Sequence, residues 1–201
     1  MRAALITSVL VTATGCGALW IATDGGLALT TESARRLRVE RTQPSVPNAA
    51  LETMTGETET LRPDTGNLTL IEFIYTTCPT ICQSAGAAFA RLRDAAEAEG
   101  LAPRLRMLSL SFDPEADNLA QLAAYGARHK ADGRVWTVAR PDPDDLPELL
   151  ATFGVTVIPD GWGGYTHNAG IHLVDDRGRL VAITDADDVG GALAVARSFL
   201  Q

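Results

Sequence analysis

The feature that most limits the possible folds is a strand that leads directly into a helix carrying two cysteines. Residues 68–75 are mostly apolar, β-branched or aromatic, which predicts a strand covered on both faces. Apolar residues then recur every three or four positions from Ile81 to Ala96, which predicts a helix. Cys78 and Cys82 lie at the junction, about one helical turn apart. Such a unit indicates a sheet with helices packed on it.

The rest of the chain continues to alternate between strand and helix patterns. The further predicted elements are strands at 105–112 and 135–139, helices at 119–129, 146–153 and 189–200, and a hairpin of strands 171–174 and 180–183. This order predicts an α/β sandwich with a mixed central sheet. In such sheets reactive groups gather beyond the carboxyl ends of the strands, which is where the two cysteines lie.

An uncharged run of 20 residues, 3–22, precedes this domain. It is long enough to cross the ~30 Å core of a bilayer, which predicts an N-terminal transmembrane helix. A cleaved export signal and a lipoprotein signal at Cys16 are alternatives. Four arginines within 35–41 favour the opposite orientation, but the positive-inside rule weakens 13 or more residues beyond a span. We therefore predict a single anchor in the cell membrane and a domain on the non-cytoplasmic, periplasmic side.

Composition divides the chain into three segments and excludes one class of partner. We expect an anchor or signal at 1–22, a tether without sustained periodicity at 23–48, and a folded domain at 49–201. Residues 45–201 carry 22 acidic and 12 basic side chains, a charge that repels phosphate backbones and argues against nucleic-acid binding. Three cysteines are too few for a disulfide scaffold.

The cysteine pair is the main candidate for chemistry. Cys78 is predicted to be the N-cap of the helix, with Pro79 at the first helical position. Backbone N–H groups and the helix dipole stabilise a thiolate there and lower the thiol pKa. The two thiols can form a disulfide or bind one metal ion. A structural disulfide or two idle buried thiols is the alternative, although closing so short a loop stabilises a fold little.

A metal held by two thiols needs further ligands, and the chain offers three histidines. His129 ends a predicted helix, where the dipole favours it, and His172 lies inside a predicted strand. His167 ends a flexible loop, 159–166, that can carry an imidazole across the sheet end to both sulfurs. Two thiolates and an imidazole suit copper, since thiolates select Cu(I) and imidazole accommodates Cu(II). Zinc with water as a fourth ligand is the alternative.

Three motifs together resemble the Sco/SenC family. They are Thr-Cys-Pro-Thr-Ile-Cys at 77–82, Ser-Phe-Asp-Pro-Glu at 111–115, and His167 followed by His-Leu-Val-Asp-Asp-Arg-Gly at 172–178. The resemblance runs from about residue 48 to the C-terminus. Two positions depart from the family pattern: Gln83 stands where many members have proline, and His172 stands where an aromatic residue is common.

The resemblance implies a membrane-tethered, thioredoxin-like domain that binds one copper ion through Cys78, Cys82 and His167, with Asp113 as an acidic residue near the site. It implies a metallochaperone for the dinuclear copper site of cytochrome c oxidase, acting by copper delivery, by thiol reduction, or both. The implied partners are copper, the copper-bearing oxidase subunit, other envelope copper or thiol proteins, and the membrane.

Two enzyme classes compete with this interpretation. A general thiol–disulfide oxidoreductase of the cell envelope needs both cysteines but is indifferent to His167. A peroxidase in which Cys78 attacks peroxide is disfavoured, because no arginine near it in sequence is an evident activator. The leading expectation is therefore a metal carrier with possible thiol chemistry, not primarily an enzyme.

Overall fold

The computed structural model describes residues 2–62, 66–78 and 81–200; the side chains at 2–4 and 81–83 lie outside the description. By its internal contacts the chain divides into two compact units, Met1–Thr42 and Gln43–Gln201. Each unit is described by itself.

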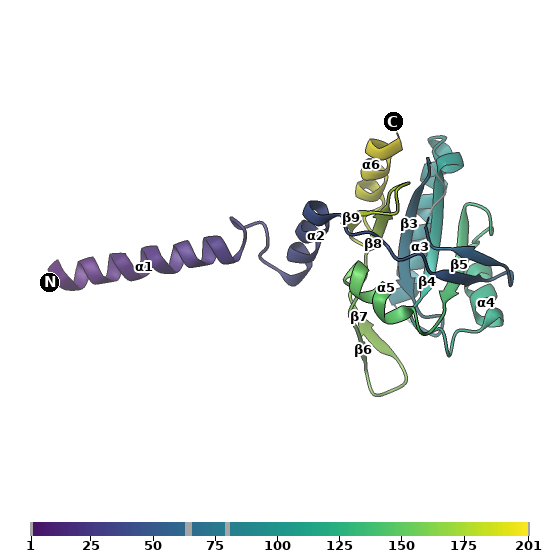
Figure 1. The fold of residues 1–201 in the computed structure, drawn as a ribbon, viewed down its shortest axis with the longest axis horizontal. Helices are drawn as coiled ribbons and strands as arrows, with labels where there is room; N and C mark the ends of the chain where they lie inside the picture. Colours follow the sequence, from purple (N-terminus) through teal and green to yellow (C-terminus); the bar gives the residue numbers. More distant parts are fainter. Residues whose placement is uncertain (1, 63–65, 79–80, 201) are drawn as a thin grey trace. The chain divides into compact units, whose positions relative to one another are not determined.

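The N-terminal unit begins with helix α1 (Arg2–Ala22), drawn in purple in Figure 1. Within the described residues, Leu5–Ala22 is the one helical segment long and apolar enough to span a membrane. Eighteen residues rise about 27 Å as a helix, close to the thickness of a bilayer core. The expected apolar N-terminal helix is therefore present.

Helix α2 (Thr31–Thr42) lies within the stretch 23–48, which shows no sustained periodicity and for which no helix was predicted. The Ser33 amide N–H donates to the Thr30 hydroxyl at 3.0 Å, and the Thr30 amide N–H donates to the Ser33 hydroxyl at 2.9 Å. Glu32 pairs with Arg35 at 2.7 Å. This helix is stabilised by its cap and by charge pairs and lacks an apolar stripe. Since the sequence prediction relied on such stripes, it did not find the helix.

The second unit is an α/β domain (Figure 1). Its elements are β1 (Ala50–Thr53), β2 (Thr58–Thr60), β3 (Leu68–Ile74), α3 (Ile81–Ala98), the 3₁₀ helix η1 (Ala102–Arg104), β4 (Leu105–Ser111), α4 (Leu119–His129), β5 (Trp136–Pro141), α5 (Leu146–Phe153), β6 (Val157–Pro159), β7 (Tyr165–His167), β8 (Ile171–Val174), β9 (Leu180–Thr184) and α6 (Val189–Leu200).

The central sheet has seven strands in the order β2-β1-β5-β4-β3-β8-β9. The three inner strands β5, β4 and β3 are parallel to one another, and both edges are antiparallel. The predicted mixed sheet and the hairpin of β8 and β9 are confirmed. The β1–β2 hairpin was not predicted, because its short, polar strands carry little of the alternation that marks a half-buried strand.

Alternation along β3 assigns its side chains to two apolar layers. Leu68 and Leu70 belong to a core with Phe89 of α3, which packs edge-to-face on Trp136 at 5.4 Å between ring centroids. Phe73 faces the other side and contacts Phe153 of α5 at 5.2 Å. Helices therefore cover both faces of the sheet, which is why β3 is buried along its whole length.

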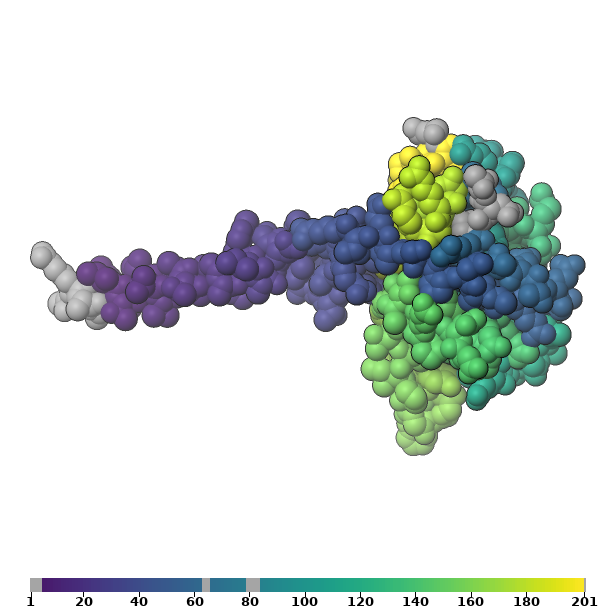
Figure 2. Space-filling view, viewed as in Figure 1, coloured from purple at the N-terminus to yellow at the C-terminus, as the bar shows by residue number. Residues whose placement is uncertain are grey.

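Parallel pairing brings the ends of β3 and β4 to one edge, since Ile74 lies opposite Ser111. A second hairpin, β6–β7, stands out from the domain near this edge (Figures 1 and 2). It occupies the position where the sequence predicted a flexible loop at 159–166. Residues 160–164 do form a loop, closed by hydrogen bonds to Asp160, but the residues on either side of it belong to the two short strands, so the predicted loop is confirmed in its centre and corrected at its ends.

Candidate metal centre

Cys78 follows β3 after a turn, in which its amide N–H donates to the Tyr75 carbonyl at 3.3 Å. The described part of helix α3 begins at Ile81. The predicted N-cap position of Cys78 depends on residues 79–80, which lie outside the described residues, so it stays a prediction. The Cys78 side chain is buried. The chain therefore presents this sulfur inside the end of the sheet, not on the surface.

Cys82 lies in the first turn of α3. Its side chain lies outside the described part of the structure, as do Gln83's side chain and the predicted helix start at Pro79. The described side chains, which thus exclude Cys82, contain no group of three His, Cys, Asp or Glu able to hold a metal. The ligand set of Cys78, Cys82 and His167 therefore stays a prediction.

A fully buried carboxylate, Asp117, connects the ends of β3 and β4. It accepts hydrogen bonds from the Thr76 amide at 3.0 Å, from the Thr76 hydroxyl at 2.5 Å and from the Ser111 hydroxyl at 2.6 Å. These bonds fix the backbone two residues before Cys78. Sequence analysis selected Asp113 and missed Asp117, although hydroxyl residues after two neighbouring strands were a signal for a shared buried acceptor.

Asp113, the acidic residue expected near the site, is half-buried just after β4. Burial raises its pKa, and the neighbouring negative charge of Asp117 adds to the rise. The Tyr165 hydroxyl donates a hydrogen bond to the Asp113 carboxylate, which opposes the rise. Because Tyr165 lies two residues before His167, Asp113 contacts the hairpin that carries the third candidate ligand.

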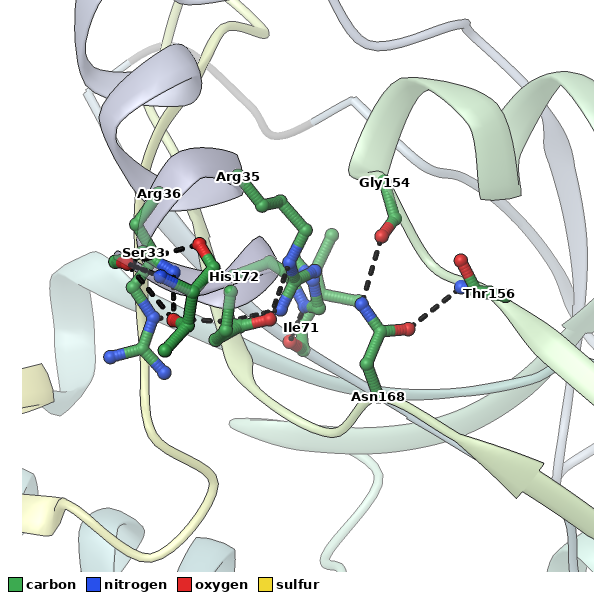
Figure 3. A network of polar contacts seen from close by, with 10 residues as sticks. Ser33, Arg35, Arg36, Ile71, Gly154, Thr156, Asn168 and His172 are labelled. Carbon is green, nitrogen blue, oxygen red and sulfur yellow. Dashed lines mark hydrogen bonds and ion pairs between the residues drawn. The ribbon is translucent and has the colours of Figure 1, made fainter. Parts of the chain in front are cut away.

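The hairpin itself is held by hydrogen bonds at both ends. At its tip the Asp160 carboxylate accepts from the Trp162 amide at 2.7 Å and the Gly164 amide at 2.9 Å. At its base the Asn168 side chain donates to the Gly154 carbonyl at 3.0 Å and accepts from the Thr156 amide at 2.7 Å (Figure 3). The strand that carries His167 is therefore fixed on both sides of the imidazole.

The His167 ring packs against Phe112 at 4.9 Å between centroids. Both ring nitrogens are buried, and neither has a hydrogen-bond partner among the described residues. Burial lowers the imidazole pKa, opposed in part by the Asn168 backbone. A buried polar atom without a partner costs about 1–3 kcal/mol. Burial therefore favours the neutral ring, which is the form that binds metals.

An aromatic cluster of Tyr75, Phe112 and Tyr165 joins the cysteine turn to the hairpin. The ring centroids lie 5.3 Å apart for Tyr75 and Phe112, 5.2 Å for Tyr75 and Tyr165, and 5.5 Å for Phe112 and Tyr165. The Tyr165 amide also donates to the Tyr75 hydroxyl at 3.4 Å. Since Tyr75 accepts from Cys78 and Phe112 contacts His167, the fold brings both candidate ligands to the same edge of the sheet.

The other two histidines lie elsewhere in the fold. His172 is buried in β8, where its Nδ1 lies 3.1 Å from the Ile71 carbonyl (Figure 3) and its ring meets Phe73 edge-on at 5.3 Å. His129 is buried at the end of α4, 4.5 Å from the Tyr125 ring. Burial lowers the pKa of His129. The effect of burial on this pKa therefore exceeds the expected stabilisation of the charged ring by the helix dipole.

Comparisons with known proteins agree with this geometry. The family model described as SCO1/SenC matches residues 44–197. A curated relative, the SCO1 protein homolog of Bacillus subtilis (strain 168), is 28% identical over 129 residues, which are 63% of this chain. The match spans about two thirds of that relative's length, 66%.

Two solved structures share the thioredoxin-like fold. BsSco, a member of the Sco family of cytochrome c oxidase assembly proteins with a disulfide switch, superposes with a TM-score of 0.69 at 22% identity, covering 80% of this chain and 95% of that one. Copper-bound yeast Sco1 superposes with a TM-score of 0.63 at 20% identity, covering 77% of this chain and 89% of that one. The family model matches most of this chain, and the cysteine turn and the histidine hairpin lie at one edge of the sheet. This chain therefore belongs to the SCO1/SenC family.

Proposed function

We propose that this protein is a membrane-tethered copper carrier that delivers copper to the dinuclear copper site of cytochrome c oxidase, or reduces the thiols of that site. The observation that carries the proposal is the buried imidazole of His167, whose two nitrogens lack partners among the described residues at the edge where Cys78 lies. Copper in yeast Sco1 and the oxidase-assembly role of BsSco's family support the same assignment.

In this proposal Cys78, Cys82 and His167 bind the copper ion, and Asp113 stands near them. The soft sulfurs favour Cu(I) and the imidazole tolerates Cu(II). Only the dithiol form binds metal, because a disulfide has no thiolate to offer. The thiol reaction needs no further reagent. The reduced cysteine pair exchanges with a disulfide of the target: the target's S–S bond breaks and gives two thiols, and a disulfide forms between Cys78 and Cys82.

The test is a copper titration of the reduced full-length chain in detergent. The wild type should bind one copper ion per chain, with a sulfur-to-copper charge-transfer band in the Cu(II) form. His167→Ala should weaken binding at least about tenfold, since even supporting residues around metals contribute that much. His129→Ala removes another buried imidazole and is the matched control; its copper affinity should equal that of the wild type.

The oxidoreductase alternative gives the opposite pattern. Disulfide reduction by the full-length chain would then need both cysteines and proceed equally well in His167→Ala. Equal copper affinity of the wild type and His167→Ala overturns the carrier assignment. The anchor is part of the proposal too, and the apolar segment Leu5–Ala22 supports a single membrane tether. We place the domain on the periplasmic side as part of the same proposal.

A further inference from the structure

One exposed side chain stands out near the candidate metal centre. Trp162, at the tip of the β6–β7 hairpin, is 93% exposed, and Ile158 on the same hairpin is 57% exposed. The hairpin projects from the body of the domain in light green in Figure 2. Large exposed aromatic side chains are the residues that most often dominate binding at protein interfaces.

The tip that presents Trp162 is a turn closed by hydrogen bonds. Asp160 closes the turn by accepting from the Trp162 and Gly164 amides, and its own amide donates to the Gly164 carbonyl at 2.9 Å. Gly161 and Gly163 have φ of +79° and +89°, which side-chain-bearing residues rarely adopt. A turn closed in this way loses little conformational entropy when a partner covers it, so exposed tryptophan there suits recognition.

Charge is distributed unevenly between the two ends of the domain. The segments 112–118 and 142–167, which follow β4 and β5, contain eight acidic residues and no lysine or arginine. Asp117 among them is buried, and Arg140 at the end of β5 lies against the Pro114 backbone. Exposed carboxylates at this end include Glu115 and Asp144. A protein that docks at this end of the domain therefore meets more negative than positive groups, with Asp160 on the same turn as Trp162.

Arginines gather at the opposite end of the sheet, where Arg106, Arg134 and Arg179 pair in turn with the carboxylates of Glu59, Asp132 and Asp175. Two surface cavities there, of about 450 and 250 Å³, are lined by half of the 12 basic residues found in 45–201: Arg62, Arg106 and Arg134 in one, and Arg104, Arg177 and Arg179 in the other. This polarity orients a positively charged partner toward the hairpin end and away from the other.

We propose that Trp162 and the acidic surface around it form the docking site for the copper-receiving protein, which presents an apolar pocket bordered by lysines or arginines. The inference rests on the proposed function, because it names the partner of that same centre. His167 lies at the base of the hairpin whose tip carries Trp162, so a partner docked at the tip contacts the same strand pair that holds the imidazole. Trp162 supplies contact area, and the carboxylates raise the rate of encounter.

The experiment follows copper transfer from the copper-loaded full-length chain to the soluble, metal-free, reduced copper domain of cytochrome c oxidase by stopped-flow absorbance. Trp162→Ala should raise the half-saturating acceptor concentration at least about tenfold and leave the limiting rate and copper affinity unchanged. Trp162→Phe should recover most of the loss. Phe199→Ala removes a 41%-exposed aromatic side chain on α6, near the arginine end, and should transfer as the wild type does.

Two substitutions that each remove one negative charge test the acidic surface separately. Glu115→Gln should slow association and weaken its dependence on salt, whereas Glu97→Gln, an exposed glutamate near the far end of α3, should not. If Trp162→Ala has the same half-saturating acceptor concentration as the wild type, the proposed docking site is wrong and the proposed function still stands. Absence of any transfer by the copper-loaded wild type overturns the copper-delivery part of the proposed function, and the inference with it.

Discussion

The carboxylate of Asp117 connects the two strand ends from which the candidate centre is built. It is fully buried and accepts three hydrogen bonds from Thr76 and Ser111 at 2.5 to 3.0 Å. Hydrogen bonds to a charged acceptor are stronger than neutral ones, and a buried group that loses its partners is costly. Asp117 thus stabilises the domain and holds the backbone ahead of Cys78 in place.

Asp117→Asn should lower the free energy of unfolding by about 1–3 kcal/mol, because the amide NH₂ group faces donors instead of acceptors. The variant should also bind copper more weakly, since the turn before Cys78 loses its anchor. Urea denaturation and copper titration measure the two effects. Asp187→Asn, an exposed carboxylate far along the chain, is the control; equal stability of the two variants would contradict the role of Asp117.

Glu72 is a second buried carboxylate, in the middle of β3. Burial raises its pKa from 4.5 to about 7, opposed by hydrogen bonds from Ser109 and Tyr125. The Ser109 hydroxyl donates to it at 2.6 Å and accepts from the Trp136 indole N–H at 2.9 Å. Between pH 4.5 and 7 the unfolded chain therefore releases a proton that the folded chain retains.

This difference in bound protons between the folded and unfolded chain decides how stability changes with pH. The free energy of unfolding should fall as pH rises from about 4.5 to about 7 and level off above, by an amount on the order of 3 kcal/mol attributable to Glu72. Glu72→Gln is neutral at every pH and should lack this slope. Urea denaturation of both proteins from pH 4.5 to 8 checks it, and parallel profiles would show that Glu72 is ionised when folded.

Among the elements, the β6–β7 hairpin decides the geometry of the histidine side. It pairs Val157 with His167, and its turn depends on Asp160. A Cβ at Gly164 would lie 2.6 Å from the Asp160 carboxylate and 3.3 Å from the Tyr75 hydroxyl. The hairpin can therefore approach the cysteine turn only because a glycine stands at this position.

Gly164→Ala should disturb the hairpin and weaken copper binding, because crowding of this kind costs about 1–3 kcal/mol at the site of contact. The central sheet should remain folded, since the hairpin forms a separate two-stranded sheet. Copper titration and circular dichroism measure the two outcomes. Gly190→Ala in α6, where the nearest atom to the added Cβ is 3.9 Å away, should change neither; copper affinity equal to wild type in Gly164→Ala would be the contrary result.

At the scale of the whole molecule, the proposed membrane tether rests on the apolar segment Leu5–Ala22. Charged residues near the centre of a span cost about 2.5–3.5 kcal/mol each on insertion. Leu10→Arg combined with Val11→Arg should therefore move the protein from the membrane fraction to the soluble fraction in a carbonate extraction. Leu27→Arg with Leu29→Arg alters exposed apolar residues outside the segment and should leave it in the membrane; if both pairs behave alike, the segment is not the anchor.

The parts of the fold that sequence analysis predicted correctly are those in which burial repeats along one element. The apolar run from Leu68 to Ile74 and the spacing of Phe89 and Leu92 reflect one strand and one helix face packed on the same core. The β6–β7 hairpin lacked this signal. Its strands are three residues long and half-exposed, and its stability comes from the Asp160 turn and from Tyr75, which is distant in sequence.

The residues of the candidate centre show the same division. Cys78, Cys82 and His167 could be selected from the sequence because thiol and imidazole groups are rare and their chemistry is specific, and Asp113 could be placed after a strand. The N-cap position of Cys78 could not be judged, since it depends on where the helix begins. Asp117 was missed because a buried carboxylate is distinguished from an exposed one by its partners alone.

The sequence by itself determined the apolar N-terminal helix, the mixed α/β sandwich, the family and the candidate ligands, because each depends on residue type and short-range spacing. Only the tertiary structure decided that Asp117 joins β3 to β4, that the histidine segment is a hairpin, and that the His167 imidazole is buried without a partner among the described residues. These features arise from contacts between side chains up to 90 residues apart, such as Tyr75 and Tyr165, and no local pattern encodes them.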